Sequence, residues 1–147
     1  MRWAEITGDS WTLPAARNKT NVELVRPLSA AAMAILASLP HSGEFVFSRT
    51  GEAPLSGLSR FKIELDRASG TEGWVIHDLR RTSRSLMSRA GVASDHAERC
   101  LGHVIGSIRG VYDRHSYQAE MLLAYEKLAA LIGSIVDPQP NVVSIRR

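Results

Sequence analysis

The sequence predicts an α+β fold that is mostly helical, with a small antiparallel sheet near its N-terminus. Short apolar segments separated by polar turns occupy residues 3–28. From residue 29 onward, apolar residues recur at helical spacing between capping and stop residues. The length of 147 residues is enough to bury one core without disulfides or a structural metal. We therefore expect a single domain over 1–147, with a flexible tail over 137–147 after the last helix.

The predicted sheet begins with a hairpin. Residues 3–6 and 11–13 are apolar enough for strands, and Thr7-Gly8-Asp9-Ser10 between them has the composition of a tight turn. A third strand is predicted over 22–28, because that segment alternates loosely and follows a polar turn at 17–21.

The first two helices are marked by the residues at their ends. Ser29 is a predicted N-cap for an Ala-rich helix that ends before Pro40. A second helix is predicted over 56–69, with Gly70 as its stop. One face of this second helix is apolar and carries Phe61, Leu65 and Ala68.

Three further helices are predicted over 77–90, 95–101 and 119–136. Gly91 follows the first of them as a C-terminal stop residue. Asp95 and Glu98 have the spacing of a capping box at the start of the second. An apolar stripe runs along the third and consists of Met121, Tyr125, Leu128, Ile132 and Ile135.

The charge distribution suits a polyanionic partner. Lysine and arginine outnumber aspartate and glutamate by 18 to 15, which gives a formal net charge of +3. Seven arginines fall between residues 80 and 114: Arg80, Arg81, Arg84, Arg89, Arg99, Arg109 and Arg114. A local positive field of this kind favours DNA, and the alternative interpretation is an arginine-rich helix face in solvent.

Cysteine content and hydropathy indicate a cytoplasmic protein. Cys100 is the only cysteine, so no internal disulfide is possible. No stretch approaches the roughly 18 apolar residues that a membrane-spanning helix needs, and we expect no membrane partner. No apolar signal segment follows Met1.

Three short motifs in the second half of the chain carry the chemistry. They are His77-Asp78-Leu79-Arg80, Leu101-Gly102-His103, and Tyr112 nine positions after that histidine. Their order and spacing resemble the catalytic signature of tyrosine recombinases of the phage-integrase type. Upstream, Arg17-Asn18-Lys19-Thr20 resembles the hairpin of that family with its catalytic lysine. The resemblance covers nearly the whole chain and implies the C-terminal part of a catalytic domain, encoded by a bacterium or a phage.

The resemblance implies a DNA recombinase that works through a 3′-phosphotyrosyl intermediate without a metal or other cofactor. Tyr112 is the expected nucleophile, and Arg80 suits the phosphate because its planar guanidinium can bind two phosphate oxygens at once. On the family pattern His77 is the base and His103 the donor to the phosphate oxygens. Lys19 is expected to protonate the departing 5′ oxygen.

Double-stranded DNA and other recombinase protomers in a synaptic assembly are the expected partners. Arg81, Arg84 and Arg109 are predicted DNA contacts, Arg81 with a structural contact as the alternative. Asp78 is interpreted as an acidic residue facing the helix N-terminus. We expect the protein in the cytoplasm, associated with the nucleoid when it is bound to DNA.

Each candidate taken singly also has a structural interpretation. A lone histidine usually lies on the surface or is hydrogen-bonded inside a core. A tyrosine is usually a half-buried aromatic residue with a hydrogen-bonded hydroxyl. Lys19 alone is a turn lysine. Tyr117 is a rival nucleophile, but the family spacing favours Tyr112. His41, His96 and His115 have no matching role and are interpreted as structural or solvent-facing.

Two other functions compete with an active recombinase. A recombinase of this family has another catalytic arginine on a helix before the segment that 1–6 resembles, and we expect the chain as given to lack it. The first alternative is therefore an inactive, truncated integrase remnant with residual DNA binding. The second is a metal-dependent phosphohydrolase, which the histidines and Asp78 suggest but the clustered arginines disfavour.

Overall fold

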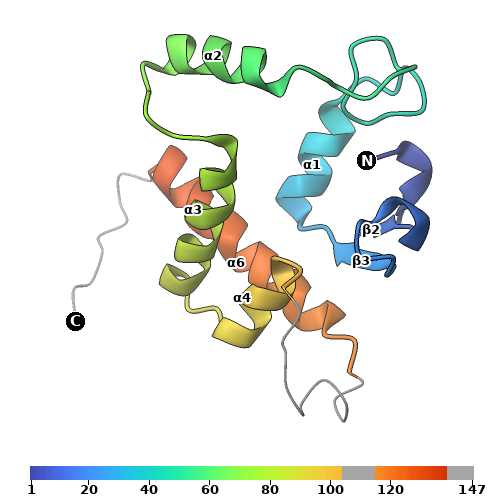
Figure 1. The fold of residues 1–147 in the computed structure, drawn as a ribbon. Coiled ribbons are helices and arrows are strands. Elements are labelled where there is room, and N and C mark those ends of the chain that lie inside the picture. Colours follow the sequence, from blue (N-terminus) through green and yellow to red (C-terminus); the bar gives the residue numbers. More distant parts are fainter. Residues whose placement is uncertain (104–114, 139–147) are drawn as a thin grey trace. The chain divides into compact units, whose positions relative to one another are not determined.

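A computed structural model describes residues 1–103 and 115–138 of the chain. The chain divides into two compact units, Met1–Thr82 and Ser83–Arg147 (Figure 1). Their boundary falls inside helix α3, Ile76–Arg89. The elements confirm the predicted class, because a small antiparallel sheet precedes a series of helices.

The sheet of the first unit has three strands in the order β1-β2-β3, all antiparallel. They are β1 (Ile6–Thr7), β2 (Ser10–Leu13) and β3 (Leu24–Pro27). In the central strand, Trp11 pairs with Ile6 on one side and with Arg26 on the other. The predicted hairpin turn is correct, since Gly8 takes the left-handed conformation that a tight turn needs (φ 59°).

The predicted strand over 3–6 is wrong for its first three residues. Trp3–Glu5 forms a short 3₁₀ helix, η1, instead. The backbone N–H of Glu5 donates to the Arg2 carbonyl (3.1 Å), and the Glu5 carboxylate accepts from the Arg2 backbone N–H (2.9 Å). These two reciprocal bonds close the turn, which an apolar pattern alone cannot reveal.

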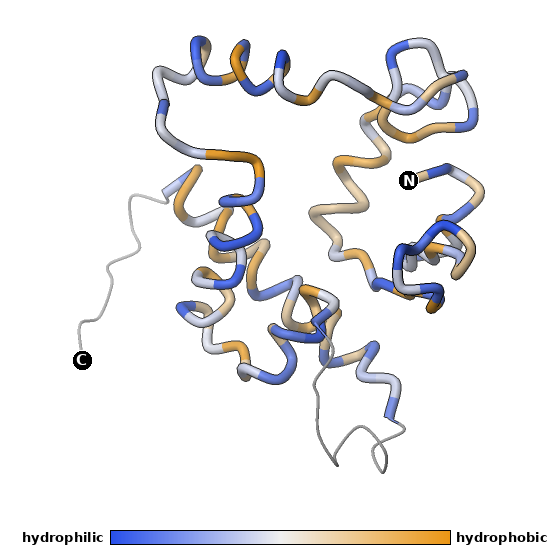
Figure 2. The backbone as a smooth tube through the Cα atoms, in the orientation of Figure 1, coloured by the Kyte–Doolittle hydropathy of each residue, from blue (hydrophilic) through white to orange (hydrophobic). Residues whose placement is uncertain are grey.

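Helix α1 (Ala30–Ser38) and helix α2 (Leu58–Ser69) confirm the next two predictions. The Ser29 hydroxyl accepts a hydrogen bond from the backbone N–H of Ala32 (3.3 Å), as an N-cap should. Figure 2 shows that α1 is apolar or intermediate in hydropathy along its length. Helix α2 begins two residues later than predicted and ends at Gly70, which is left-handed (φ 64°).

The second unit has its core between the end of α3, helix α4 (Ser94–Cys100) and helix α6 (Gln118–Val136). Five side chains are buried there: Met87, Ala97, Cys100, Met121 and Ala124. The apolar stripe of α6 is confirmed for its first half, since Tyr125 and Leu128 pack against this cluster. Ile132 and Ile135 stay exposed, at 39% and 49%.

The end of α3 turns the chain toward α4 through a C-terminal cap at Gly91. The Val92 N–H donates to the Met87 carbonyl (3.0 Å), and the Gly91 N–H donates to the Ser88 carbonyl (3.1 Å). This pair of bonds is the Schellman motif, and Gly91 has the left-handed backbone that the motif requires (φ 71°). The predicted stop at Gly91 is therefore confirmed. Within 1–103 and 115–138, no helix is long and apolar enough to cross a membrane.

Candidate functional site

The first predicted motif lies at the beginning of α3, one residue inside the helix. Asp78 accepts a hydrogen bond from the Val75 backbone N–H (2.9 Å), and Arg81 donates to the same carboxylate (2.7 Å). These two bonds hold the pKa of Asp78 below its ordinary value, the Val75 N–H contributing most. Asp78 is thus the acidic residue predicted at the helix N-terminus, and the structural contact expected of Arg81 is present.

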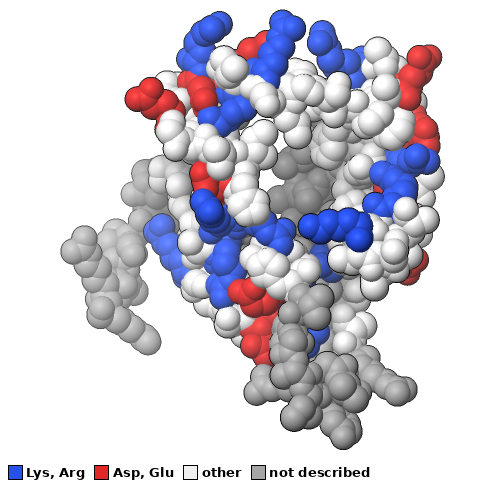
Figure 3. Space-filling model, in the orientation of Figure 1, with Lys and Arg blue, Asp and Glu red and all other residues white. Residues whose placement is uncertain are grey.

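Helix spacing places His77, Arg80 and Arg84 on one side of α3, because they are three and four residues apart. His77 is exposed and Arg80 is half-buried. Lys and Arg side chains gather over α3 in the space-filling view (Figure 3), with a few acidic side chains among them.

Arg84 is fixed by bonds within its own unit. Its Nε donates to Glu98 (2.7 Å), its Nη1 to the Ser88 hydroxyl (2.5 Å) and its Nη2 to the Ser94 hydroxyl (2.9 Å). These acceptors come from α3 and α4, so the guanidinium joins the two helices. The DNA contact predicted for Arg84 stays a prediction.

Glu98 is the residue that brings two predicted site residues together. Its Oε1 accepts from Arg84, and its Oε2 lies 2.5 Å from Nδ1 of His103. Both bonds lower the pKa of Glu98 below its ordinary value, the bond to His103 more than the bond to Arg84. The capping box predicted for Asp95 and Glu98 is wrong, because α4 is capped by Ala93 without a side-chain bond and Glu98 reaches its tertiary partners instead.

His103 is held by its backbone as well as its ring. Its N–H donates to the Glu98 carbonyl (3.0 Å), across a turn in which Gly102 is left-handed (φ 73°). Half of the side chain is exposed (51%). Since Nδ1 is engaged by Glu98, Nε2 is the ring atom left for a ligand.

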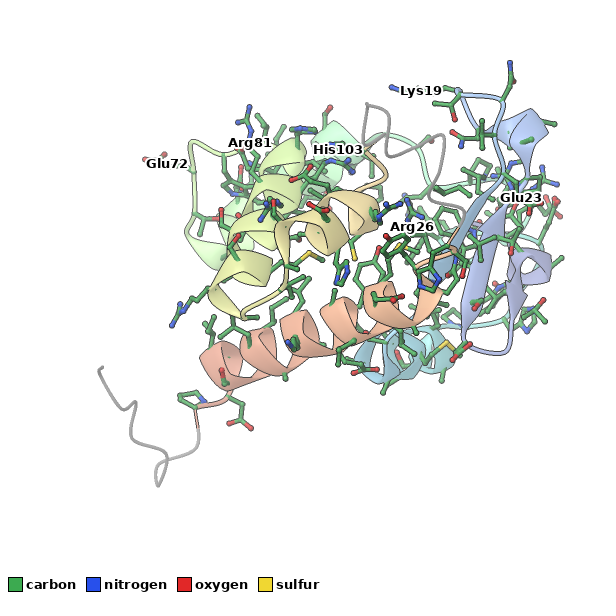
Figure 4. All side chains as sticks on the ribbon, turned by 90° about the horizontal axis from the view of Figure 1, so that it is seen from below. Lys19, Glu23, Arg26, Glu72, Arg81 and His103 are labelled. Atoms are coloured by element: carbon green, nitrogen blue, oxygen red, sulfur yellow. The ribbon has the colours of Figure 1, made fainter. Side chains whose placement is uncertain are left out.

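Lys19 lies in the connection between β2 and β3, exposed to solvent (Figure 4). The side chain of its neighbour Asn18 donates to the Val22 carbonyl (2.7 Å), and the Asn18 carbonyl accepts from the Asn21 N–H (2.9 Å). At the start of this connection, Arg17 is hydrogen-bonded to Glu5. The turn around Lys19 is therefore ordered by its neighbours.

Tyr117, the rival nucleophile, is half-buried and its ring contacts three other side chains. The guanidinium of Arg99 lies 3.6 Å from the centre of its ring. The rings of His115 and His96 lie 4.6 Å and 5.8 Å from it, measured between centroids. Nε2 of His115 also lies 2.9 Å from Oε1 of Glu120. The pKa of Glu120 is held below its ordinary value, first by its own backbone N–H and to a smaller extent by His115 and His96. Tyr117 is the N-cap residue of α6, so these contacts lie at the start of that helix.

The structure thus brings Arg84 and His103 together through Glu98, and it places His77 and Arg80 on α3. Tyr112 and Arg109 lie outside the described residues. The convergence of Lys19, His77, Arg80 and His103 on one phosphate stays a prediction. Among the described residues, no three side chains of His, Cys, Asp or Glu lie close enough together to hold a metal ion.

Sequence reasoning missed Glu98 as a member of the site. The Asp95-to-Glu98 spacing fits a helix cap, and the tertiary partner lies 14 residues upstream at Arg84. One signal was available: Glu98 is five residues before His103, and Gly102 between them permits the tight turn that returns the ring to the helix.

Comparison with known proteins points to one relative. In an alignment 123 residues long that covers 79% of this chain, the sequence is 35% identical to the prophage integrase IntA of Escherichia coli strain K12. The matched region is 30% of that protein, so the chain spans about a third of the curated relative. No protein-family model and no solved structure matches the chain. The sequence identity supports a relationship between this chain and the prophage integrases.

Proposed function

We propose that this chain is the C-terminal part of the catalytic domain of a site-specific DNA recombinase. The observation that carries the proposal is the fixed position of His103, whose ring is hydrogen-bonded to Glu98, which in turn binds Arg84. A histidine held through Nδ1 presents Nε2 to a ligand, as a phosphate-binding histidine must. The relationship to a prophage integrase supports the same assignment.

The proposed reaction transfers a DNA phosphoryl group to Tyr112 and back. The Tyr112 Oη attacks the phosphorus, the bond to the 5′ oxygen breaks, and the DNA is left joined to the protein through a 3′-phosphotyrosyl link. His77 takes the phenol proton, because a phenol with an ordinary pKa of about 10 is rarely ionised at neutral pH. Lys19 gives a proton to the departing oxygen, and rejoining runs these steps in reverse.

Arg80 and His103 have an electrostatic part in this reaction. Negative charge builds on the nonbridging oxygens in the transition state, and fixed donors aimed at those oxygens stabilise it. Arg80 suits that place because its guanidinium keeps its charge and binds two oxygens at once. Arg81, Arg84 and Arg109 would meet neighbouring phosphates of the duplex. Other protomers of the recombinase would complete the synaptic assembly, in the bacterial cytoplasm on the nucleoid.

The test is covalent capture of DNA. The matched region of the E. coli prophage integrase is replaced by the corresponding residues of this chain, and the DNA substrate carries the attachment site of that integrase. A nicked suicide substrate carrying that site is incubated with the protein without divalent metal, and the products are separated by denaturing electrophoresis. We expect an adduct that maps to Tyr112, and Tyr112→Phe should abolish it while DNA binding persists.

Three outcomes would speak against the proposal in different ways. Attachment at Tyr117 would mean that the wrong nucleophile was assigned. A requirement for divalent metal would favour the phosphohydrolase alternative. DNA binding without any adduct would favour an inactive integrase remnant.

A further inference from the structure

Glu98 makes contacts that a helix-surface glutamate does not need. Each of its two carboxylate oxygens has its own cationic or ionisable partner, Arg84 at 2.7 Å and His103 at 2.5 Å. Its backbone carbonyl accepts a third bond, from the His103 N–H (3.0 Å). One residue therefore fixes both the chain path and the ring orientation of His103.

We propose that Glu98 is the positioning residue of the site, which acts through Nδ1 of His103 and is itself held by Arg84. The inference rests on the proposed function, in which His103 binds the scissile phosphate. With Nδ1–H donated to Glu98, the ring presents Nε2 to the phosphate and can donate from it only as an imidazolium. A carboxylate behind a functional histidine orients the ring and sets which nitrogen carries the proton.

The positive charge of Arg84 offsets the repulsion between the Glu98 carboxylate and a DNA phosphate. A lone Glu98 would repel a phosphate a few ångströms away. Arg84 supplies a compensating positive charge at 2.7 Å, so the trio of Arg84, Glu98 and protonated His103 carries a net charge of about +1. The Glu98 carboxylate can therefore orient His103 without excluding the ligand.

The surrounding contacts separate this role from a purely structural one. Arg84 is anchored independently by the hydroxyls of Ser88 and Ser94 (2.5 and 2.9 Å), so it keeps its place when Glu98 is changed. Helix α4 is held by the buried side chains of Ala97 and Cys100, on positions other than Glu98. The variant Glu98→Gln should therefore fold and lose chiefly the orientation of His103.

The first arm of the test measures the contact itself in this chain, without any activity. Long-range ¹H–¹⁵N NMR of the His103 ring should show the proton of the neutral form on Nδ1. In Glu98→Gln it should move toward the commoner Nε2 position, because the carboxylate acceptor is gone. Asp95→Asn, on the same helix, removes an equal charge and should leave the His103 ring unchanged. An Nε2–H ring in the wild type would overturn the inference.

The second arm is a double-mutant cycle of adduct formation in the recombinase used to test the proposed function. Glu98→Gln should slow adduct formation about tenfold, as the loss of a supporting carboxylate typically does. In a His103→Ala background the same change should alter the rate less than about twofold, because Glu98 acts through the missing ring. Asp95→Asn should match the wild type.

The two arms separate the failure of this inference from the failure of the proposed function. If the wild type forms no adduct, the proposed function fails, and the NMR arm alone then decides whether Glu98 sets the His103 ring. If adducts form and Glu98→Gln slows the reaction equally with and without His103, Glu98 is a structural residue and the inference is overturned.

Discussion

The guanidinium of Arg17 donates a hydrogen bond to the carboxylate of Glu5 and ties the connection that carries Lys19 to the first turn of the chain. The Glu5 side chain is only 7% exposed. It also accepts from the Arg2 backbone N–H (2.9 Å) and from the indole N–H of Trp11 (3.1 Å). Burial opposes the charge of Glu5, but these three donors outweigh it and hold the pKa of the carboxyl below its ordinary value.

Glu5→Ala should destabilise the first unit by about 3 kcal/mol, because it leaves the donors of Arg17 and Trp11 without their buried acceptor. Urea unfolding followed by tryptophan fluorescence reports this unit, since all three tryptophans precede Ser83. Glu23→Ala is the matched control, an exposed glutamate on the β2–β3 connection, and should change the free energy of unfolding by less than about 0.5 kcal/mol. Equal losses for the two variants would contradict the role of Glu5.

The contribution of Glu5 should depend on pH with a definite sign. Its folded-state pKa is lowered, so its stabilisation is complete above the ordinary value of 4.5 and is lost as the pH falls through the lowered value. The difference in unfolding free energy between the wild type and Glu5→Gln should therefore be largest near pH 7 and shrink below pH 4.5. Urea titrations at several pH values measure it. A difference that stays constant down to pH 3 would argue against a lowered pKa.

Local signals in the sequence account for much of this fold. Ser29, Gly70 and Gly91 each end or begin a helix as predicted, because a cap depends on residues within one turn. The strand predicted over 3–6 is wrong at residues 3–5, where reciprocal hydrogen bonds between Arg2 and Glu5 form a 3₁₀ helix instead. An apolar pattern carries no information on those hydrogen bonds.

The site was predictable only in part, and for a related reason. His77, Arg80 and His103 could be named because their order and spacing resemble one family signature. Glu98 was missed although its spacing to His103 offered a signal, since its bond to Arg84 joins residues 14 apart whose meeting depends on the turn at Gly91. Tyr112 was named from the family spacing and Arg109 from the clustering of arginines, and both lie outside the described residues.

Gly91→Ala should destabilise the second unit by about 1 kcal/mol, because an alanine is disfavoured in the left-handed conformation. Apart from its two chain neighbours, no residue has an atom within 4 Å of a Cβ added at Gly91, so the effect is conformational and not a clash. Gly133→Ala is the control: it lies inside α6 with equally open space and should stabilise by about 0.5 kcal/mol. Thermal unfolding followed by circular dichroism compares the stability of the two variants. A change in stability of the same sign in both would contradict the left-handed cap assigned to Gly91.

Tyr125→Phe should lower the free energy of unfolding by about 1 kcal/mol, because it removes one hydrogen bond at the end of α4. The Tyr125 hydroxyl donates to the Cys100 carbonyl (2.8 Å), which belongs to the last turn of that helix. Met87→Ala, in the same core, should cost about 3 kcal/mol because it opens a cavity at a side chain that is 1% exposed. Chemical denaturation of the two variants tests this order. A larger loss of unfolding free energy in Tyr125→Phe than in Met87→Ala would contradict this prediction.

Arg80→Lys should slow adduct formation about a hundredfold, comparable to the loss of one donor in an oxyanion hole. The lysine keeps a positive charge but cannot bind two phosphate oxygens in the plane of a guanidinium. Affinity for DNA should change little, because the number of cations is unchanged. Single-turnover assays on the suicide substrate, paired with anisotropy titrations of the same duplex, separate the two effects.

Arg81→Lys is the control for that experiment, because it makes the same chemical change one position along α3. The Arg81 side chain is 73% exposed and pairs with Asp78 in an exposed contact that contributes little. Its replacement should alter the rate of adduct formation less than about threefold, since a phosphate contact outside the reacting group needs only the charge. If both lysine variants slow the reaction equally, Arg80 has no special place at the scissile phosphate. A loss of DNA affinity in Arg80→Lys without a slower reaction of the bound complex would assign Arg80 to binding the duplex instead.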